Sequence, residues 1–448
     1  MAERGGMRRI LNPARVIPLA FLAGITVGTI LLMLPAARAG EGHAPFIVAL
    51  FTATSAFCVT GLTVVDTHAY WSGLGHFLIL ALAQVGGLGI MTGATLLGLL
   101  MSGRNRLSTR ILARAEMRSL DLGDVSGVVR IVVVATFTVE GVLALVMAAD
   151  FWWLKGMPPI QALWYGLFHS VSAWNNAGFN LEGVSGASMA GDFPLLFALM
   201  VGVVLGGLGF PVLHELRKEW RTPATWSIHT KLTVMGSALL LLFGWIFVLV
   251  AEWGNPSTLG GMGAGQAVVN ALFHSVMTRS GGFASFDMTA LHDETLALSH
   301  GLMLIGGGSA STAGGIKVTT FFLLGFVALA EFRGRSDANA FGRRVPPEVQ
   351  RQALLIALLA VGTVSLGFLL LLMMTDLPFA FVLFDAISAF ATVGLSTGVA
   401  AALPPEGQAV LVILMYVGRV GTISVAAAVA LHVGQPRYRY PEERPIIG

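Results

Sequence analysis

The chain has 448 residues, of which 55% are hydrophobic and only 11% are charged. A typical soluble globular protein has about 25% charged residues, so this composition excludes an ordinary soluble protein and indicates a membrane protein. A disordered chain is also excluded, because disorder requires low hydrophobicity and high net charge. The net charge of +3, spread over short loops, argues against nucleic-acid binding. A single cysteine, Cys58, permits no intrachain disulfide.

The apolar residues form long and short runs that alternate along the chain. A membrane-spanning helix needs about 20 apolar residues, and eight runs approach that length. The long runs lie near residues 16–35, 76–101, 128–149, 193–214, 229–251, 298–330, 352–375 and 408–432. Four runs that are too short to cross lie near residues 45–58, 160–175, 266–278 and 379–391. This order predicts an all-α polytopic membrane protein with four repeats of span, short helix and span.

The first long run has an alternative interpretation as a secretory signal. Arg4, Arg8 and Arg9 precede it, and the segment 36–39 (Ala-Ala-Arg-Ala) is similar to a cleavage site. Its apolar core is longer than that of a usual signal, and its removal would leave the first repeat without an outer helix. We therefore favour a membrane span.

The basic residues predict how the repeats are oriented. The repeats are placed at residues 1–101, 102–214, 215–331 and 332–435, with a C-terminal tail at 436–448. Most arginines and lysines lie in the two chain ends and in the loops 102–130, 215–231 and 331–351. Positively charged segments stay on the cytoplasmic side of a membrane. Both termini are therefore predicted to be cytoplasmic, and the short helices to enter from the outside.

Each short run ends in a similar motif. The motif starts with a phenylalanine and ends with a glycine, and the distance between them is equal in three copies and one residue shorter in the third. The copies run from Phe51 to Gly61, Phe168 to Gly178, Phe273 to Gly282 and Phe384 to Gly394. Four matching copies predict packing around one central, pseudo-fourfold pore.

These motifs are suited to bind a cation. A short helix that ends at mid-membrane directs the negative end of its dipole inward, and extended residues beyond it can replace the water shell of an ion with backbone carbonyls. Glycine permits the backbone angles that this requires. The predicted filter residues are Val59, Thr60, Gly61, Asn176, Ala177, Gly178, Ser280, Gly281, Gly282, Thr392, Val393 and Gly394. The alternative is that the glycines only allow close helix packing.

Four segments carry a resemblance to the Trk/Ktr/HKT superfamily of potassium transporters. They are Cys58-Val-Thr-Gly61-Leu, Asn175-Asn-Ala-Gly178-Phe, Arg279-Ser-Gly-Gly282-Phe and Thr392-Val-Gly394-Leu. Within the superfamily the chain is most similar to the Ktr membrane subunit, because its first filter motif follows the first span. The resemblance covers nearly the whole chain and implies that each repeat contributes one filter segment.

The resemblance also implies a function and partners. It implies K+ uptake across the cytoplasmic membrane, with a dependence on Na+ as in relatives and no organic cofactor in this chain. The expected assembly is a homodimer in the lipid bilayer, on a cytoplasmic RCK-type (KtrA-like) ring of regulatory subunits that bind ATP or ADP. The loops 102–130 and 331–351 are the expected docking surfaces. A Trk-type transporter with an NAD-responsive partner is the alternative within the superfamily.

The sixth long run is interrupted at residues 306–317 by five glycines. Each glycine costs about 1 kcal/mol relative to alanine in a helix, so a break is predicted at mid-membrane. Lys317 follows Ile316, so the Gly-Lys ending of a phosphate-binding loop is absent. In the resembled family this interruption acts as a gate, and Ala310 stands where relatives commonly have glycine. The predicted gate residues are Gly306, Gly307, Gly308, Ser311, Thr312, Gly314, Gly315, Lys317 and Arg419.

Arg419 places a charge inside the eighth run. A charge at that depth is costly and marks an ion pathway or a specific partner. The resemblance implies that Arg419 projects beneath the filter, where its charge would repel K+. The alternative is a salt bridge to Glu140 or Asp385.

Two further features have weaker interpretations. His169 and His274 are expected to make packing contacts and hydrogen bonds. The glycine motifs at 84–89 and 206–209 are expected to admit the neighbouring short helices. An intramembrane enzyme that uses either histidine is the alternative from another class, but the chain lacks a paired nucleophile or a metal-binding motif. No catalytic residue is predicted.

Overall fold

The computed structural model describes residues 13–102, 125–182, 189–335 and 337–421. The four short helices are α3 (Phe46–Phe57), α8 (Pro159–Trp174), α12 (Ala264–Met277) and α16 (Phe379–Phe390). The helices that precede them are α2 (Pro13–Leu32), α7 (Val125–Trp153), α11 (Ile228–Glu252) and α15 (Pro347–Leu372). The helices that follow them are α5 (Gly73–Ser102), α9 (Phe193–Leu208) with α10 (Phe210–Glu219), α13 (Asp293–Leu304) with α14 (Val318–Phe332), and α18 (Pro405–Tyr416). The predicted short helices are therefore confirmed.

The remaining elements are short. Single turns of helix lie at Pro35–Ala37, Thr67–Tyr70 (α4), Pro223–Thr225, Leu259–Gly261, Met288–Ala290 and Val399–Ala402 (α17), and a π-helical turn lies at Val417–Gly421. The strands β1 (Asn339–Ala340) and β2 (Arg343–Arg344) form a small antiparallel hairpin. This hairpin is the one departure from the predicted all-α fold within the described part of the chain.

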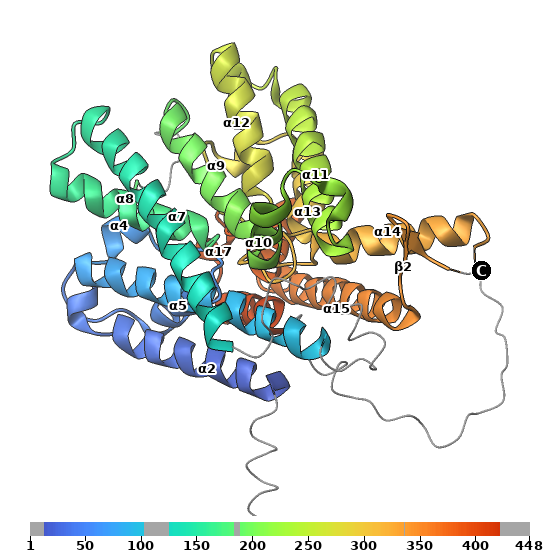
Figure 1. The fold of residues 1–448 in the computed structure, drawn as a ribbon. Helices are drawn as coiled ribbons and strands as arrows, with labels where there is room; N and C mark the ends of the chain where they lie inside the picture. Colours follow the sequence, from blue (N-terminus) through green and yellow to red (C-terminus); the bar gives the residue numbers. More distant parts are fainter. Residues whose placement is uncertain (1–12, 103–124, 183–188, 336, 422–448) are drawn as a thin grey trace, which may run out of the picture.

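The helices follow one another around the molecule in chain order (Figure 1). Each short helix packs against the long helix that precedes it, in the pairs α2 with α3, α7 with α8, α11 with α12 and α15 with α16. Neighbouring groups meet where α5 contacts α7, α9 contacts α12 and α14 contacts α15. The ring closes because α18 packs against α3.

The helix lengths differ from the predicted eight spans. Within the described residues, four helices are long and apolar enough to cross a membrane, and a fifth span results if α9 and α10 are counted as one bent pair. The eight-span arrangement is therefore not confirmed. The sixth run is split into α13 and α14, and the eighth run is described only to Gly421.

The fourth long run was expected to be one continuous span, and this expectation is wrong. The chain bends by 97° between α9 and α10. Gly209 at the bend has a φ of +87°, a conformation that glycine adopts without steric cost. Pro211 in the first turn of α10 has no N–H to bond back into α9.

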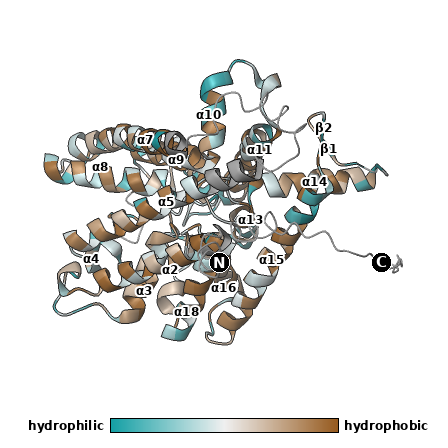
Figure 2. Cartoon of the chain, turned by 60° about the horizontal axis from the view of Figure 1, so that its bottom comes forward, coloured by the Kyte–Doolittle hydropathy of each residue, from teal (hydrophilic) through white to brown (hydrophobic). Residues whose placement is uncertain are grey.

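The outer faces of the long helices are apolar. In α11, the side chains of Leu239, Phe243, Ile246 and Val250 are each more than half exposed and recur at helical spacing. Figure 2 shows hydrophobic residues along most of α15 and hydrophilic ones on α10. An exposed apolar surface of this kind is costly in water, so these faces are suited to contact lipid.

Candidate ion pathway

The four predicted filter segments have the same backbone conformation. In each, the last glycine and the residue two positions before it have positive φ. These pairs are Val59 (57°) with Gly61 (89°), Asn176 (59°) with Gly178 (69°), Ser280 (72°) with Gly282 (76°), and Thr392 (47°) with Gly394 (97°). Positive φ is uncommon for residues other than glycine. The sequence repeat therefore corresponds to a repeat of backbone geometry.

The four glycines lie around one centre. A Cβ atom added to Gly282 would lie 2.6 Å from the carbonyl oxygen of Val393 and 2.8 Å from the Cα of Gly178. A Cβ added to Gly61 would meet the carbonyl of Ala177, and one added to Gly394 would meet that of Thr60. Each segment thus contacts its neighbours, and the contacts close a ring.

Serine hydroxyls hold three of the segments against their own short helices. The hydroxyl of Ser55 accepts from the Gly61 amide at 3.1 Å and donates to the Leu62 carbonyl at 2.7 Å. Ser172 donates to the Phe179 carbonyl, and Ser388 accepts from the Gly394 amide. These serines were not among the predicted site residues. Their recurrence at the same position after the motif phenylalanine was the signal that could have revealed them.

The glycine-rich loop at 306–317 separates α13 from α14, as predicted. Its two ends are paired with each other, because the Gly306 amide donates to the Ile316 carbonyl at 2.9 Å and the Ile316 amide donates to the Leu304 carbonyl at 3.0 Å. Ala310, where a glycine was expected from the resembled family, has a φ of +58°.

The loop fills the bend between α9 and α10. The Gly308 amide donates to the carbonyl of Gly207 at 2.8 Å. A Cβ atom on Gly307 would lie 2.5 Å from the same carbonyl oxygen. The glycine motif at 206–209 was expected to admit a short helix, and Gly206 does face Trp174 of α8. The motif also supplies carbonyls at the end of α9 to the loop.

The loop also contacts the filter segments directly. The hydroxyl of Thr312 donates to the side chain of Asn176 at 2.7 Å, and the Gly314 amide donates to the hydroxyl of Ser280 at 2.9 Å. These contacts involve the first residues of the segments and not the final glycines. The loop therefore lies against one end of the ring.

Two cationic side chains lie beside the loop and the ring. Arg419 is 3% exposed, and its Nη1 lies 3.4 Å from the Thr392 hydroxyl. Lys317 donates to the Ala313 carbonyl and interacts electrostatically with Arg419. The alternative salt bridge is wrong, because Glu140 bonds Gln84 and Asn175, and Asp385 bonds Ser396, Thr397 and Ala400.

The comparison with known proteins identifies the family. The family model TrkH, described as a cation transport protein, matches residues 17–439. The chain belongs to this family. The Ktr system potassium uptake protein B of Bacillus subtilis is 33% identical over 441 residues, which are 98% of this chain and 97% of the relative. The potassium/sodium uptake protein NtpJ of Enterococcus hirae is 34% identical over 456 residues, which are 99% of this chain and 98% of the relative.

A solved structure shares the fold. The crystal structure of TrkH from Vibrio parahaemolyticus has a TM-score of 0.69 at 17% identity, and the match covers 92% of this chain and 83% of that chain. Because the TrkH family consists of membrane transport proteins, the alternative of an intramembrane enzyme is wrong, and a membrane location is supported.

In this TrkH-family chain, His169 and His274 make the hydrogen bonds that were expected. The Nδ1 of His169 lies 2.7 Å from the Tyr165 carbonyl, and its Nε2 contacts Asn180, just beyond the second filter segment. The Nε2 of His274 lies 3.0 Å from the Ser299 hydroxyl. Among the described residues, no group of three or more His, Cys, Asp and Glu side chains is arranged to hold a metal ion.

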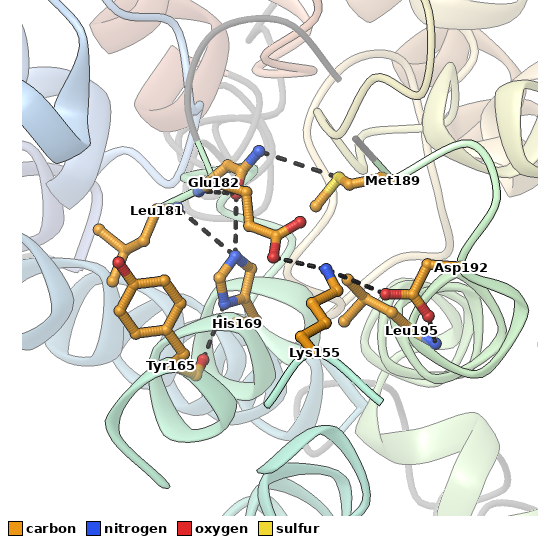
Figure 3. Close-up of polar contacts among 9 residues, drawn as sticks. Lys155, Tyr165, His169, Leu181, Glu182, Met189, Asp192 and Leu195 are labelled. Carbon is orange, nitrogen blue, oxygen red and sulfur yellow. Dashed lines mark hydrogen bonds and ion pairs between the residues drawn. The ribbon is translucent and has the colours of Figure 1, made fainter. Parts of the chain in front are cut away.

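A lysine connects the segment after the second filter motif to α9 (Figure 3). The Nζ of Lys155 lies 2.5 Å from the Glu182 carboxylate and 3.0 Å from the Asp192 carboxylate. Asp192 also caps α9 by accepting from the Leu195 amide. Burial alone would lower the pKa of Lys155, but the two carboxylates outweigh burial and the net shift of the pKa is upward.

We expect Lys155→Met to destabilise the protein by about 2 kcal/mol at neutral pH, because it leaves two buried carboxylates without their cation. A raised lysine pKa gives stability that is fully present below the unfolded value of about 10.4. That stability is lost as the pH rises through the higher folded value. Thermal unfolding of the wild type and of Lys155→Met at pH 8 and pH 11 measures the loss of stability at each pH. Lys231→Met, which removes an exposed ammonium bonded to the Ala224 carbonyl, is the control. An equal deficit at both pH values would contradict the assignment.

Proposed function

We propose that this protein takes up K+ across the cytoplasmic membrane through a selectivity filter formed by the four segments that end in Gly61, Gly178, Gly282 and Gly394. The observation that carries this proposal is the closed ring of segments with matching positive φ values. Relatives of nearly equal length that are named as potassium uptake proteins support K+ as the ion. The name of NtpJ supports Na+ as a second ion.

The proposed filter replaces the hydration shell of the ion with backbone carbonyl oxygens. Positive φ at alternate positions turns successive carbonyls toward one side, where they can coordinate a dehydrated cation. Each short helix ends two or three residues before the first positive-φ residue of its segment, so the negative ends of four helix dipoles lie close to the centre and favour a cation there. Irregular backbone is tolerated inside a membrane when it lines such a cavity.

The glycine-rich loop is the proposed gate. Its contacts with Asn176 and Ser280 place it against one end of the ring, so it obstructs an ion that leaves the filter. Residues 306–308, 311–312 and 314–315 form the obstruction, and Lys317 and Arg419 lie beside it. Displacement of the loop would open the path.

The proposed arrangement in the membrane follows the positive-inside rule, with both termini cytoplasmic and four repeats at 1–101, 102–214, 215–331 and 332–435. We propose a homodimer on an RCK-type ring that binds ATP or ADP. The relatives named as components of Ktr systems support a Ktr-type assembly over a Trk-type one with an NAD-responsive partner. Most of the expected docking loop 102–130 and the tail 436–448 lie outside the described residues, whereas the loop 331–351 carries the β1–β2 hairpin.

The test is ion uptake. In cells that lack other potassium uptake systems, expression of this chain with its regulatory partner is expected to restore growth at low external K+ and to drive Rb+ uptake. In vesicles, the purified protein is expected to pass K+ much faster than Na+. The control is a variant of the loop or the filter that is inactive but is expressed at the same level as the wild type. Equal flux of both ions, or flux of neither, would contradict the proposal.

A further inference from the structure

The third filter segment is held differently from the other three. In the first, second and fourth copies a serine of the short helix bonds its own segment. In the third copy Met277 occupies the serine position, and the distance from Phe273 to Gly282 is one residue shorter. A thioether cannot replace a hydroxyl as a donor. The Met277 carbonyl still accepts from the Gly281 amide at 2.9 Å and from the Gly282 amide at 3.4 Å, but no side chain of α12 bonds the segment.

The side-chain hydrogen bonds of the third segment reach the glycine-rich loop, the neighbouring segment and α11. The Ser280 hydroxyl accepts from the Gly314 amide at 2.9 Å and donates to the Thr392 carbonyl at 2.9 Å. The guanidinium of Arg279 donates through Nη2 to the Gly306 carbonyl at 2.8 Å and through Nη1 to the Ser237 carbonyl at 3.0 Å. Two consecutive residues of the third segment thus hold both ends of the loop.

The bond from Arg279 to the loop is costly to lose. The side chain is 6% exposed, and the ion pairs found among the described residues do not include it. Two backbone carbonyls and the Ser237 hydroxyl are the acceptors for its guanidinium, and its Nε has none. A buried charge that loses a partner is strongly destabilised. A small cavity lined by Arg279, Ser237 and Gly307 lies beside the bond.

We propose that Arg279 and Ser280 couple the third filter segment to the loop, so that the ion in the filter controls how firmly the loop is held. The inference rests on the proposed function. An ion that fits the ring keeps residues 280–282 in place and preserves the bonds to Gly306 and Gly314. An ion that fits less well loosens the segment and with it the loop. Coupling of this kind is reciprocal, so loop displacement also changes ion binding.

The test is amide hydrogen exchange of residues 304–318 in vesicles that contain the purified protein, measured in KCl and in NaCl. In the wild type we expect exchange to be about tenfold slower in KCl, the effect of one charge-assisted hydrogen bond. In Arg279→Gln and in Ser280→Ala the loop amides should exchange quickly in both salts. The ratio of the exchange rate in NaCl to that in KCl should then approach one. Arg279→Lys keeps the charge and can donate in one direction. It should restore part of the difference in loop exchange between the two salts.

Thr138→Ala is the matched control, because it removes an exposed hydroxyl of α7 that donates to the Val134 carbonyl of its own helix and bonds neither the filter segments nor the loop. It is expected to keep the wild-type ratio. A purely structural role of Arg279 would raise exchange equally in both salts and leave the ratio unchanged, which would overturn the proposal, as would a wild type with no salt dependence. If Arg279→Gln does not fold, Ser280→Ala decides. Rb+ uptake by the same wild-type vesicles tests the proposed function separately.

Discussion

Substitution of Gly282 by alanine is expected to lower the ratio of K+ to Na+ uptake by at least about tenfold and to reduce K+ uptake itself. Gly282 has a φ of +76°, which costs a residue with a side chain on the order of 1 kcal/mol or more. The added methyl would also lie 2.6 Å from the Val393 carbonyl oxygen and 2.8 Å from Gly178. Both contacts are with backbone, so the segments must move and the carbonyls lose their positions around the ion.

The measurement is Rb+ and Na+ uptake by the same vesicles, with protein amount and thermal stability determined in parallel. Gly301→Ala is the matched control, because Gly301 lies in α13 of the same repeat and a Cβ there meets nothing within 4 Å. Gly301→Ala should transport as the wild type does. Unchanged ion selectivity in a folded Gly282→Ala protein would show that this glycine serves helix packing alone.

Replacement of Arg419 by glutamine is expected to increase the rate of K+ uptake. Arg419 lies beside Thr392, the first residue of the fourth segment, and its Nη1 is 3.4 Å from the Thr392 hydroxyl. Two of its guanidinium nitrogens have no hydrogen-bond partner. A unit charge about 8 Å from an ion raises the energy of that ion by about 2 kcal/mol at an effective dielectric constant near 20. The expected increase is therefore about tenfold or more, provided that permeation past this charge limits the rate.

The charge itself can be tested by comparing Arg419→Gln with Arg419→Lys. Glutamine can still donate to Thr392 but is neutral, whereas lysine keeps the charge. Uptake should rise in the glutamine variant and stay near the wild-type rate in the lysine variant. A similar rise in both variants would indicate that Arg419 acts through the shape of its side chain, and a fall in both would indicate a structural role.

Much of the architecture could be predicted from the sequence because it depends on short-range patterns. Runs of apolar residues locate the long helices, and Pro45, Pro158 and Pro378 directly precede three of the short ones. The glycine at the end of each motif is required locally, because the backbone there has positive φ. The break at 306–317 follows from glycine content alone.

Other features depend on contacts between residues that are far apart in the chain. At the bend near Gly209, the Gly207 carbonyl accepts from the Gly308 amide of the loop, about a hundred residues later in the chain. Neither the bonds from Arg279 to the Ser237 and Gly306 carbonyls nor the proximity of Arg419 to Thr392 follows from residue spacing. The salt bridge considered for Arg419 was chemically reasonable, but Glu140 and Asp385 had nearer partners.

The sequence by itself determined a membrane protein with four related segments and one interrupted helix, since hydropathy and glycine content act over a few residues. Only the tertiary structure decided which atoms of the four segments meet in the predicted ring and that the loop of the interrupted helix bonds the second and third of them. The physical reason is that a buried carbonyl or guanidinium must find a partner. In a closed ring of helices that partner comes from whichever part of the chain is packed beside it.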